Sequence, residues 1–172
     1  MEELGPPGAG PLAAVAVDPP QCRELVRGGQ VWRFLHSPAV PPDTPVAIAT
    51  ERIGHGRTIG TTLISLTGDA AVSFMTQPAL TSPECLAFHV QDSGAWQPAS
   101  VREHDPRLGL QSRMVVRDYP RGGKRIMYRL LLYRSHGYVA LLHLGGPAAD
   151  GDTPLFEDFA RRVYEHAERV LQ

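Results

Sequence analysis

The chain has 172 residues, of which 42% are hydrophobic and 20% charged, and its formal net charge is −1. This length and composition predict one globular domain that needs neither disulfides nor metals for stability. The near-zero charge gives the whole molecule no electrostatic attraction to nucleic acid or acidic membranes, and no segment approaches the roughly 18 apolar residues of a membrane span.

The N-terminal segment, residues 1–20, contains five prolines and several glycines. This composition predicts a flexible lead-in followed by a single domain over residues 21–172. Its first charges are Glu2 and Glu3, and its apolar run is too short for a secretion signal, so we expect a cytoplasmic protein. Lys124 is the only lysine among 17 basic residues, which indicates a GC-rich genome such as that of an actinobacterium.

The two cysteines, Cys22 and Cys85, are too few for a disulfide framework. In a cytoplasmic protein we expect both to be buried, reduced thiols. A disulfide between them is expected only if the protein is exported.

Short elements are predicted over the first two thirds of the chain from hydrophobic periodicity and from Gly, Pro and Ser positions. Strands are expected at 31–36, 46–52, 58–66 and 96–101, and short helices at 21–27, 70–76 and 82–88. The segment 54–56, Gly-His-Gly, suits a hairpin turn between two of these strands.

The last third of the chain has the clearest pattern. Three strands are predicted at 111–119, 125–134 and 138–144, joined by tight turns. A helix follows, with Thr153 as its cap and Pro154 in its first turn. Its apolar stripe recurs at helical spacing: Phe156, Phe159, Ala160, Val163, Ala167 and Val170. Tight hairpins exclude a doubly wound parallel sheet, so we predict an α+β fold with an antiparallel sheet and helices packed on it.

A local positive charge is the main candidate binding feature. Residues 102–134 contain nine Lys or Arg side chains and three Asp or Glu side chains. We expect five residues to form one outer surface of the hairpin, the basic hairpin face: Arg113, Arg117, Arg125, Met127 and Arg129. Such a surface could bind an acidic protein segment, a phosphorylated ligand or nucleic acid, although few aromatic residues lie nearby to stack on bases. Alternatively, this surface is only a solvent-exposed face of the sheet whose arginines protect the sheet edge from pairing with other strands.

Motifs for catalysis and metal binding are absent from the sequence. The seven histidines form no HxxH or HxxxH pair, and neither cysteine has a partner at zinc spacing. No GxSxG elbow or phosphate loop is present. We therefore predict a protein without enzymatic activity, metal or cofactor, and we expect His143, in the apolar strand, to be a satisfied core histidine.

Several segments resemble one known family. They are residues 56–70 (GRTIGTTLISLTGDA), the turn 119–124 (YPRGGK), the strand 137–141 (GYVAL) and the closing helix. Together they resemble the LpqN-type proteins of actinobacteria, which belong with PsbP and DcrB-like proteins in one superfamily. The resemblance implies an α/β/α sandwich over about residues 31–170 and a non-catalytic accessory role. The chain lacks the signal peptide and lipobox cysteine of LpqN, which favours a cytoplasmic relative.

Three functional hypotheses follow. The first is a protein-binding accessory module, either an adaptor or a secretion-associated chaperone. The second is a ligand-binding or enzymatic helix-grip domain of START-like type, which predicts a large apolar cavity between the sheet and the final helix. The third is a structural subunit of a phage or secretion apparatus. The sequence does not give the oligomeric state.

Overall fold

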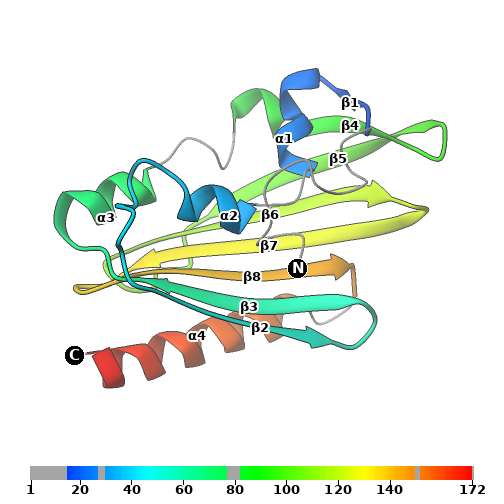
Figure 1. Cartoon of the computed structure of the whole chain (residues 1–172). Helices are drawn as coiled ribbons and strands as arrows, with labels where there is room; N and C mark the ends of the chain where they lie inside the picture. The colour runs from blue at the N-terminus through cyan, green and yellow to red at the C-terminus, as the bar shows by residue number, and fades with distance from the viewer. Residues whose placement is uncertain (1–14, 27–29, 77–81, 150–151, 172) are drawn as a thin grey trace.

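A computed structural model of the chain describes residues 15–26, 30–76, 82–149 and 152–171. Within these residues the main element is one eight-stranded antiparallel sheet with the order β1-β4-β5-β6-β7-β8-β3-β2 (Figure 1). The strands are β1 (Val17–Asp18), β2 (Val46–Ile53), β3 (Arg57–Ile64), β4 (Ala87–Asp92), β5 (Ala95–His104), β6 (Gln111–Arg121), β7 (Lys124–Arg134) and β8 (Val139–Pro147).

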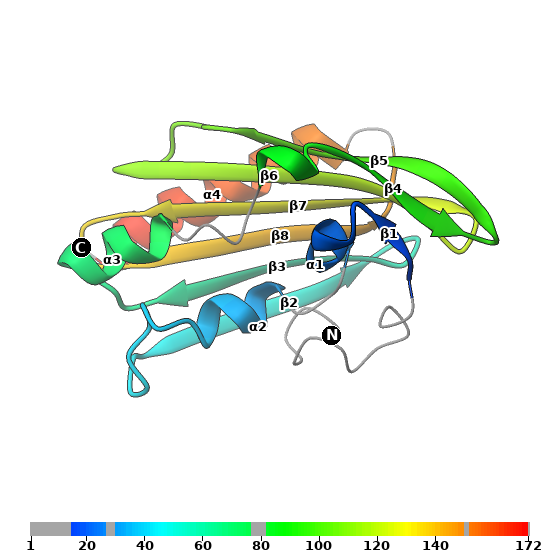
Figure 2. The same ribbon diagram turned by 90° about the horizontal axis from the view of Figure 1, so that it is seen from above.

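The helices differ greatly in length between the two sides of the sheet. One side carries the 20-residue helix α4 (Asp152–Leu171). The other side carries α1 (Arg23–Val26), α2 (Gln30–Leu35) and α3 (Gly68–Met75), together with the 3-10 turns η2 (Pro20–Cys22) and η4 (Pro83–Cys85) (Figure 2). We call these two sides the α4 face and the short-helix face.

The predicted α/β/α sandwich is wrong. The described chain is mostly sheet with few helices, and α1, α2 and α3 span only four, six and eight residues. Helices this short do not form a second helical layer, so the fold is an antiparallel sheet with one long helix on one face. The antiparallel strand pairing that the tight hairpins predicted is confirmed.

Both faces of the sheet carry an apolar core. On the short-helix face, β-strand residues pack with Phe34, Phe74 and the apolar residues of α1. On the α4 face, Phe156, Ala160 and Ala167 of α4 pack against β3, β6, β7 and β8. Val170, predicted to belong to the helix stripe, is instead 65% exposed because α4 extends beyond the packed core at its end.

Two element predictions in the first two thirds of the chain are wrong. Residues 31–36 were expected to form a strand but lie mostly in α2, where Val31 and Phe34 are buried three positions apart and Trp32 stacks on His36 four positions on. This is helical spacing, not alternation. The helix predicted at 82–88 is only the turn η4, and β4 begins at residue 87.

A disulfide joins Cys22 of η2 to Cys85 of η4, across 63 residues of sequence. The prediction of reduced thiols is therefore wrong in this structure. Both cysteines are buried in the core of the short-helix face. The bond ties the first helical turn of the domain to the segment that leads into β4.

The predicted lead-in, residues 1–20, falls largely outside the described residues, which begin at 15. Its end is part of the fold, because β1 pairs with β4 and Val17 is buried in the core.

Candidate functional site

The predicted basic hairpin face is divided between the two faces of the sheet. Arg121 pairs with Lys124, so the β6–β7 turn consists of residues 122–123 alone. In this register every odd-numbered residue of β6 lies opposite an even-numbered residue of β7, and paired residues point the same way. The predicted residues therefore separate, with Arg113 and Arg117 on the short-helix face and Arg125, Met127 and Arg129 on the α4 face. The expectation of one shared surface is wrong.

Two of the predicted arginines are buried. The exposed fraction is 2% for Arg117 and 3% for Arg129. Arg117 donates a hydrogen bond to the carbonyl oxygen of Leu25 at 3.3 Å, and its guanidinium lies 5.8 Å from the ring centroid of Tyr128. These contacts hold α1 against the sheet, so Arg117 contributes to packing and not to an outer surface.

The remaining predicted residues are partly exposed, and both arginines form ion pairs within the sheet. Arg113 pairs with Glu103 of β5, and Arg125 pairs with Asp118 of β6 at 2.6 Å. Met127 is half-buried on the α4 face. Both of these arginines are thus paired with carboxylates, and the five predicted residues do not form a continuous cationic surface.

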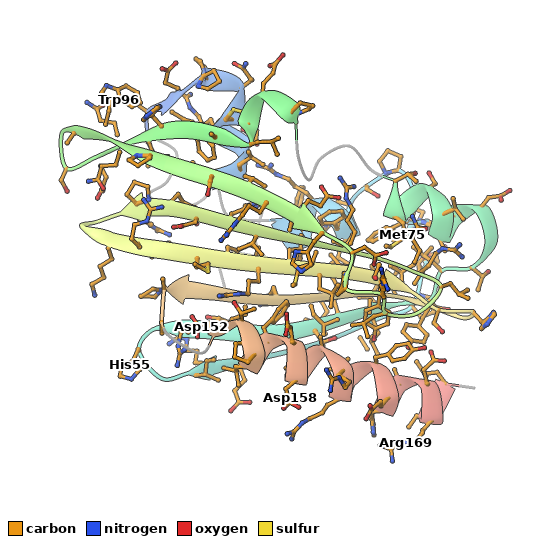
Figure 3. All side chains as sticks on the ribbon, turned by 180° about the vertical axis from the view of Figure 1, so that it is seen from behind. His55, Met75, Trp96, Asp152, Asp158 and Arg169 are labelled. Carbon is orange, nitrogen blue, oxygen red and sulfur yellow. A yellow bond between two sulfur atoms is a disulfide. The ribbon has the colours of Figure 1, made fainter. Side chains whose placement is uncertain are left out.

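A buried ion cluster holds the start of α4. Asp152 is buried and pairs with Arg57 of β3 and, at 3.8 Å, with Arg129 of β7. Arg129 also donates a hydrogen bond to the hydroxyl of Thr153 at 2.9 Å. Burial lowers the pKa of Arg129, and Asp152 opposes that shift. Figure 3 shows Asp152 at the first turn of α4, near the β2–β3 turn that carries His55.

A pocket of about 570 Å³ lies on the short-helix face, at the end of the sheet that carries the β2–β3 and β6–β7 turns. Tyr119, Ile126, Tyr128 and Pro147 form apolar walls. Arginine and histidine side chains also line it: Arg52, Arg57, Arg121 and His143. No aspartate or glutamate belongs to the described lining, and Arg52 and Arg121 give it positive charge.

Glycines make room for the rings at the base of this pocket. The rings of Tyr128 and His143 are stacked, 6.3 Å apart between centroids. A Cβ atom at Gly60 would lie 2.6 Å from the His143 ring, and one at Gly145 would lie 2.5 Å from the Tyr128 ring. Any larger residue at either glycine would displace these rings, so the cross-strand glycines fix the shape of the base.

His143 is buried, as the sequence predicts, but it is not fully satisfied. Its Nδ1 atom has no hydrogen-bond partner in the described part of the chain. Burial lowers the pKa of His143 from its ordinary value of 6.5 to about 4. The ring is therefore neutral at pH 7, with a polar atom that a bound molecule could use.

The titration of His143 predicts a pH-dependent stability. Between about pH 6.5 and pH 4 the unfolded chain binds a proton that the folded chain does not, so the free energy of unfolding should fall as the pH falls. The expected loss is about 3 kcal/mol. Urea denaturation from pH 7 to pH 4 measures it. His143→Gln should remove most of this slope, and an unchanged slope in that variant would contradict the assignment.

Strand β2 is an exposed edge of the sheet. It pairs with β3 along all eight residues, and no described strand pairs with its other side. Seven of its residues are exposed, among them Ile48 at 47%. From residue 46 to residue 50 the exposed side chains of this edge are small or apolar, and Glu51 and Arg52 follow them. An edge strand of this length can accept a further strand by main-chain hydrogen bonds.

An apolar groove of about 430 Å³ runs beside this edge, between α4 and β3. Its apolar lining comes from both elements: Leu63, Phe159, Val163, Ala167, Val170 and Leu171. Leu63 pairs with Ala47 of β2, and Thr61 pairs with Ala49, so two small side chains separate the groove from the sheet edge. Arg162 and His166 also line the groove.

Between α4 and the strands that it covers, the described residues leave no large enclosed apolar cavity of the kind that a helix-grip domain requires. Phe156 and Ala160 fill it together with Met114, Leu131 and Tyr133. Two hollows lie along the flanks of α4 in the described structure. One is the groove of about 430 Å³ beside β3, and the other measures about 260 Å³. The apolar cavity that the helix-grip hypothesis predicts is therefore not found among the described residues.

Neither the pocket nor the edge surface was found from the sequence. The one signal for the pocket is the pair Gly145-Gly146 at the end of an apolar strand, because a glycine inside a strand often marks a close approach. The edge position of β2 has no local signal, since strand order depends on which distant strand pairs with β8.

Neither a metal-binding group among the described residues nor a known relative indicates a function for the chain. The described residues contain no group of three or more His, Cys, Asp or Glu side chains that could hold a metal ion. None of the described helices is long and apolar enough to cross a membrane. No family model, curated protein or solved structure matches the chain. The resemblance to LpqN, PsbP and DcrB-like proteins therefore stays a prediction.

Proposed function

We propose that the protein is a non-enzymatic protein-binding module that captures an extended segment of a partner by strand addition at β2. The exposed eight-residue edge carries this proposal. Only an extended chain can satisfy a row of strand N–H and C=O groups, so the edge selects a strand in preference to a helix or a small molecule.

The groove beside the edge specifies the side chains of that segment. Alternate residues of an added strand would project to the α4 face, where Leu63, Phe159 and Val163 offer an apolar surface. Arg162 and His166 at the same groove favour an acidic residue in the segment. Arg162 already pairs with Asp158 at 2.8 Å, but both side chains are exposed, so a partner carboxylate can replace that weak pair.

This proposal keeps the adaptor or chaperone role implied by the family resemblance but moves its surface. The sequence predicts that an acidic partner segment binds the basic hairpin face. In the present proposal that segment binds β2 and the groove. A second copy of the chain could also pair through β2, as in a structural subunit, and the experiment must separate the two occupants.

Site-specific photo-crosslinking tests the proposal. A benzoylphenylalanine residue is placed at Ile48 or, as a control, at Leu86, and crosslinking is done in cells that naturally produce the protein. Leu86 is 49% exposed and lies next to β4, near the other end of the strand order. We expect an adduct specific to position 48 whose partner peptide alternates apolar residues and contains an acidic one.

The synthetic peptide should then bind the purified protein. Ile48→Lys should weaken binding about tenfold or more, because a lysine on an edge strand opposes strand addition. Leu86→Lys removes a similar exposed apolar side chain and should leave the affinity within about twofold. The absence of a position-specific adduct, or an adduct with a second copy of the chain, would contradict the proposal.

A further inference from the structure

We propose that the pocket on the short-helix face binds a small organic anion with a flat apolar body. This inference goes beyond the proposed function, because the pocket and the groove lie on opposite faces of the sheet. The volume of about 570 Å³ is within the range of about 300–1,000 Å³ usual for small-molecule sites.

The charge of the lining selects an anion. Arg52 of β2 and Arg121 of β6 reach the pocket from opposite sides. Arg57 also lines the pocket, but its guanidinium donates hydrogen bonds to Asp152 and to the carbonyl oxygen of Gly54. No aspartate or glutamate belongs to the described lining. Guanidinium groups bind carboxylate and sulfonate oxygens by charge-assisted hydrogen bonds.

The walls and the base select the body of the ligand. Tyr119, Ile126 and Pro147 are apolar, which favours an aromatic or aliphatic body over a sugar. At the base, the buried His143 lines the pocket, and its Nδ1 atom lacks a partner among the described residues. A buried polar atom of this kind is costly unless it is paired, and a polar group on a ligand would pair it.

The site is built and does not arise from a chance gap between side chains. Gly60 and Gly145 on neighbouring strands allow the His143 and Tyr128 rings to lie flat at the base. Both oxygens of Asp92 accept hydrogen bonds from the backbone N–H groups of the β6–β7 turn, at 2.7 and 2.8 Å. These bonds hold the wall at Gly122 in place.

Two fluorescent probes with the same aromatic body test the inference. One is 8-anilinonaphthalene-1-sulfonate, which is anionic, and the other is N-phenyl-1-naphthylamine, which is neutral. We expect saturable binding of the anionic probe and at least about tenfold weaker binding of the neutral probe. Equal affinities, or no saturable binding of the anionic probe, would overturn the inference.

Four variants locate the bound probe. Arg52→Glu should weaken the anionic probe about tenfold or more, and Thr58→Trp should block it by filling the pocket. Arg169→Glu makes the same charge change on α4, outside the pocket lining, and should leave the affinity within about twofold. Val170→Glu alters the groove beside β2 and should also have no effect. Loss of binding in Val170→Glu alone would place the probe in the groove and overturn the inference.

An NMR readout keeps the test valid if a variant is poorly folded. In the wild-type protein the ring signal of His143 should shift as the anionic probe saturates, because His143 lines the pocket. The ring signal of His166, which lines the groove, should not shift. A shift of the His166 signal without a shift of the His143 signal would overturn the inference. That result would concern the groove on the other face of the sheet, and strand addition at β2 would still be decided by its own crosslinking test.

Discussion

We expect Asp152→Ala to lower the free energy of unfolding by about 3–5 kcal/mol, as measured by urea denaturation. Asp152 is the buried partner of two guanidinium groups, those of Arg57 and Arg129. Its removal would leave Arg129, which is 3% exposed, without a carboxylate in the cluster. The substitution also removes the hydrogen bond that the backbone N–H of Ala149 donates to Asp152 at 3.1 Å.

Asp158→Ala is the matched control on the same helix. Asp158 pairs with Arg162 one turn away, and both are exposed, so its loss should change the free energy of unfolding by less than about 0.5 kcal/mol. Adding Arg129→Met to Asp152→Ala should restore at least half of the lost stability, because an unpaired buried charge causes most of the loss. A cost below about 1 kcal/mol for Asp152→Ala would contradict this account of the cluster.

We expect reduction of the Cys22–Cys85 disulfide to lower the free energy of unfolding by about 4 kcal/mol. The bond closes a loop with a sequence separation of 63 residues. A crosslink over that length removes about 4 kcal/mol of chain entropy from the unfolded state. Urea denaturation with and without a reducing agent measures the effect, and the Cys22→Ser plus Cys85→Ser variant should match the reduced protein.

A thiol count on protein purified under denaturing conditions tests whether the bond forms in cells. Zero free thiols is the expected result, because the described chain contains no free cysteine. Two free thiols, together with equal stability in the presence and absence of reductant, would contradict the bond. Disulfides persist mainly in oxidising compartments, so the bond counts against the predicted cytoplasmic location.

The strands of the last third could be predicted from the sequence because each has a local pattern. Residues 125–130 set Ile126, Tyr128 and Leu130 in alternation with Arg125, Met127 and Arg129. The glycines at 122–123 have φ angles of 60° and 72°, the conformation of a two-residue hairpin turn. The pairing of 46–52 with 58–66 was equally local. The prediction was wrong where the apolar residues of a short segment fit both the two-residue period of a strand and the 3.6-residue period of a helix. Residues 31–36 are such a segment.

The prediction of the basic hairpin face was wrong for a different reason, which is the pairing register of β6 and β7. A two-residue turn pairs Arg113 with Leu132 and Arg129 with Val116, so the arginines of the two strands point to opposite faces. Shifting the register by one residue would place them together, as predicted. The burial of Arg117 and Arg129 was also not predictable, because α1 and the start of α4, which cover them, are distant in sequence.

The functional surfaces depend on long-range pairing, which local patterns do not encode. β3 pairs with β8, and this leaves β2 at the edge of the sheet. The same pairing brings Gly60 opposite His143 and so creates the base of the pocket. A register or strand order cannot be chosen from hydrophobic alternation alone when, as in β8, nearly every residue is apolar.

Hydrogen exchange of the β2 amides, with and without the peptide found by crosslinking at Ile48, tests strand addition most directly. An added strand would pair with the outer side of β2, so we predict slower exchange of backbone amides within residues 46–52 when the peptide is bound. Unchanged exchange in β2, with new protection elsewhere, would contradict the proposed function.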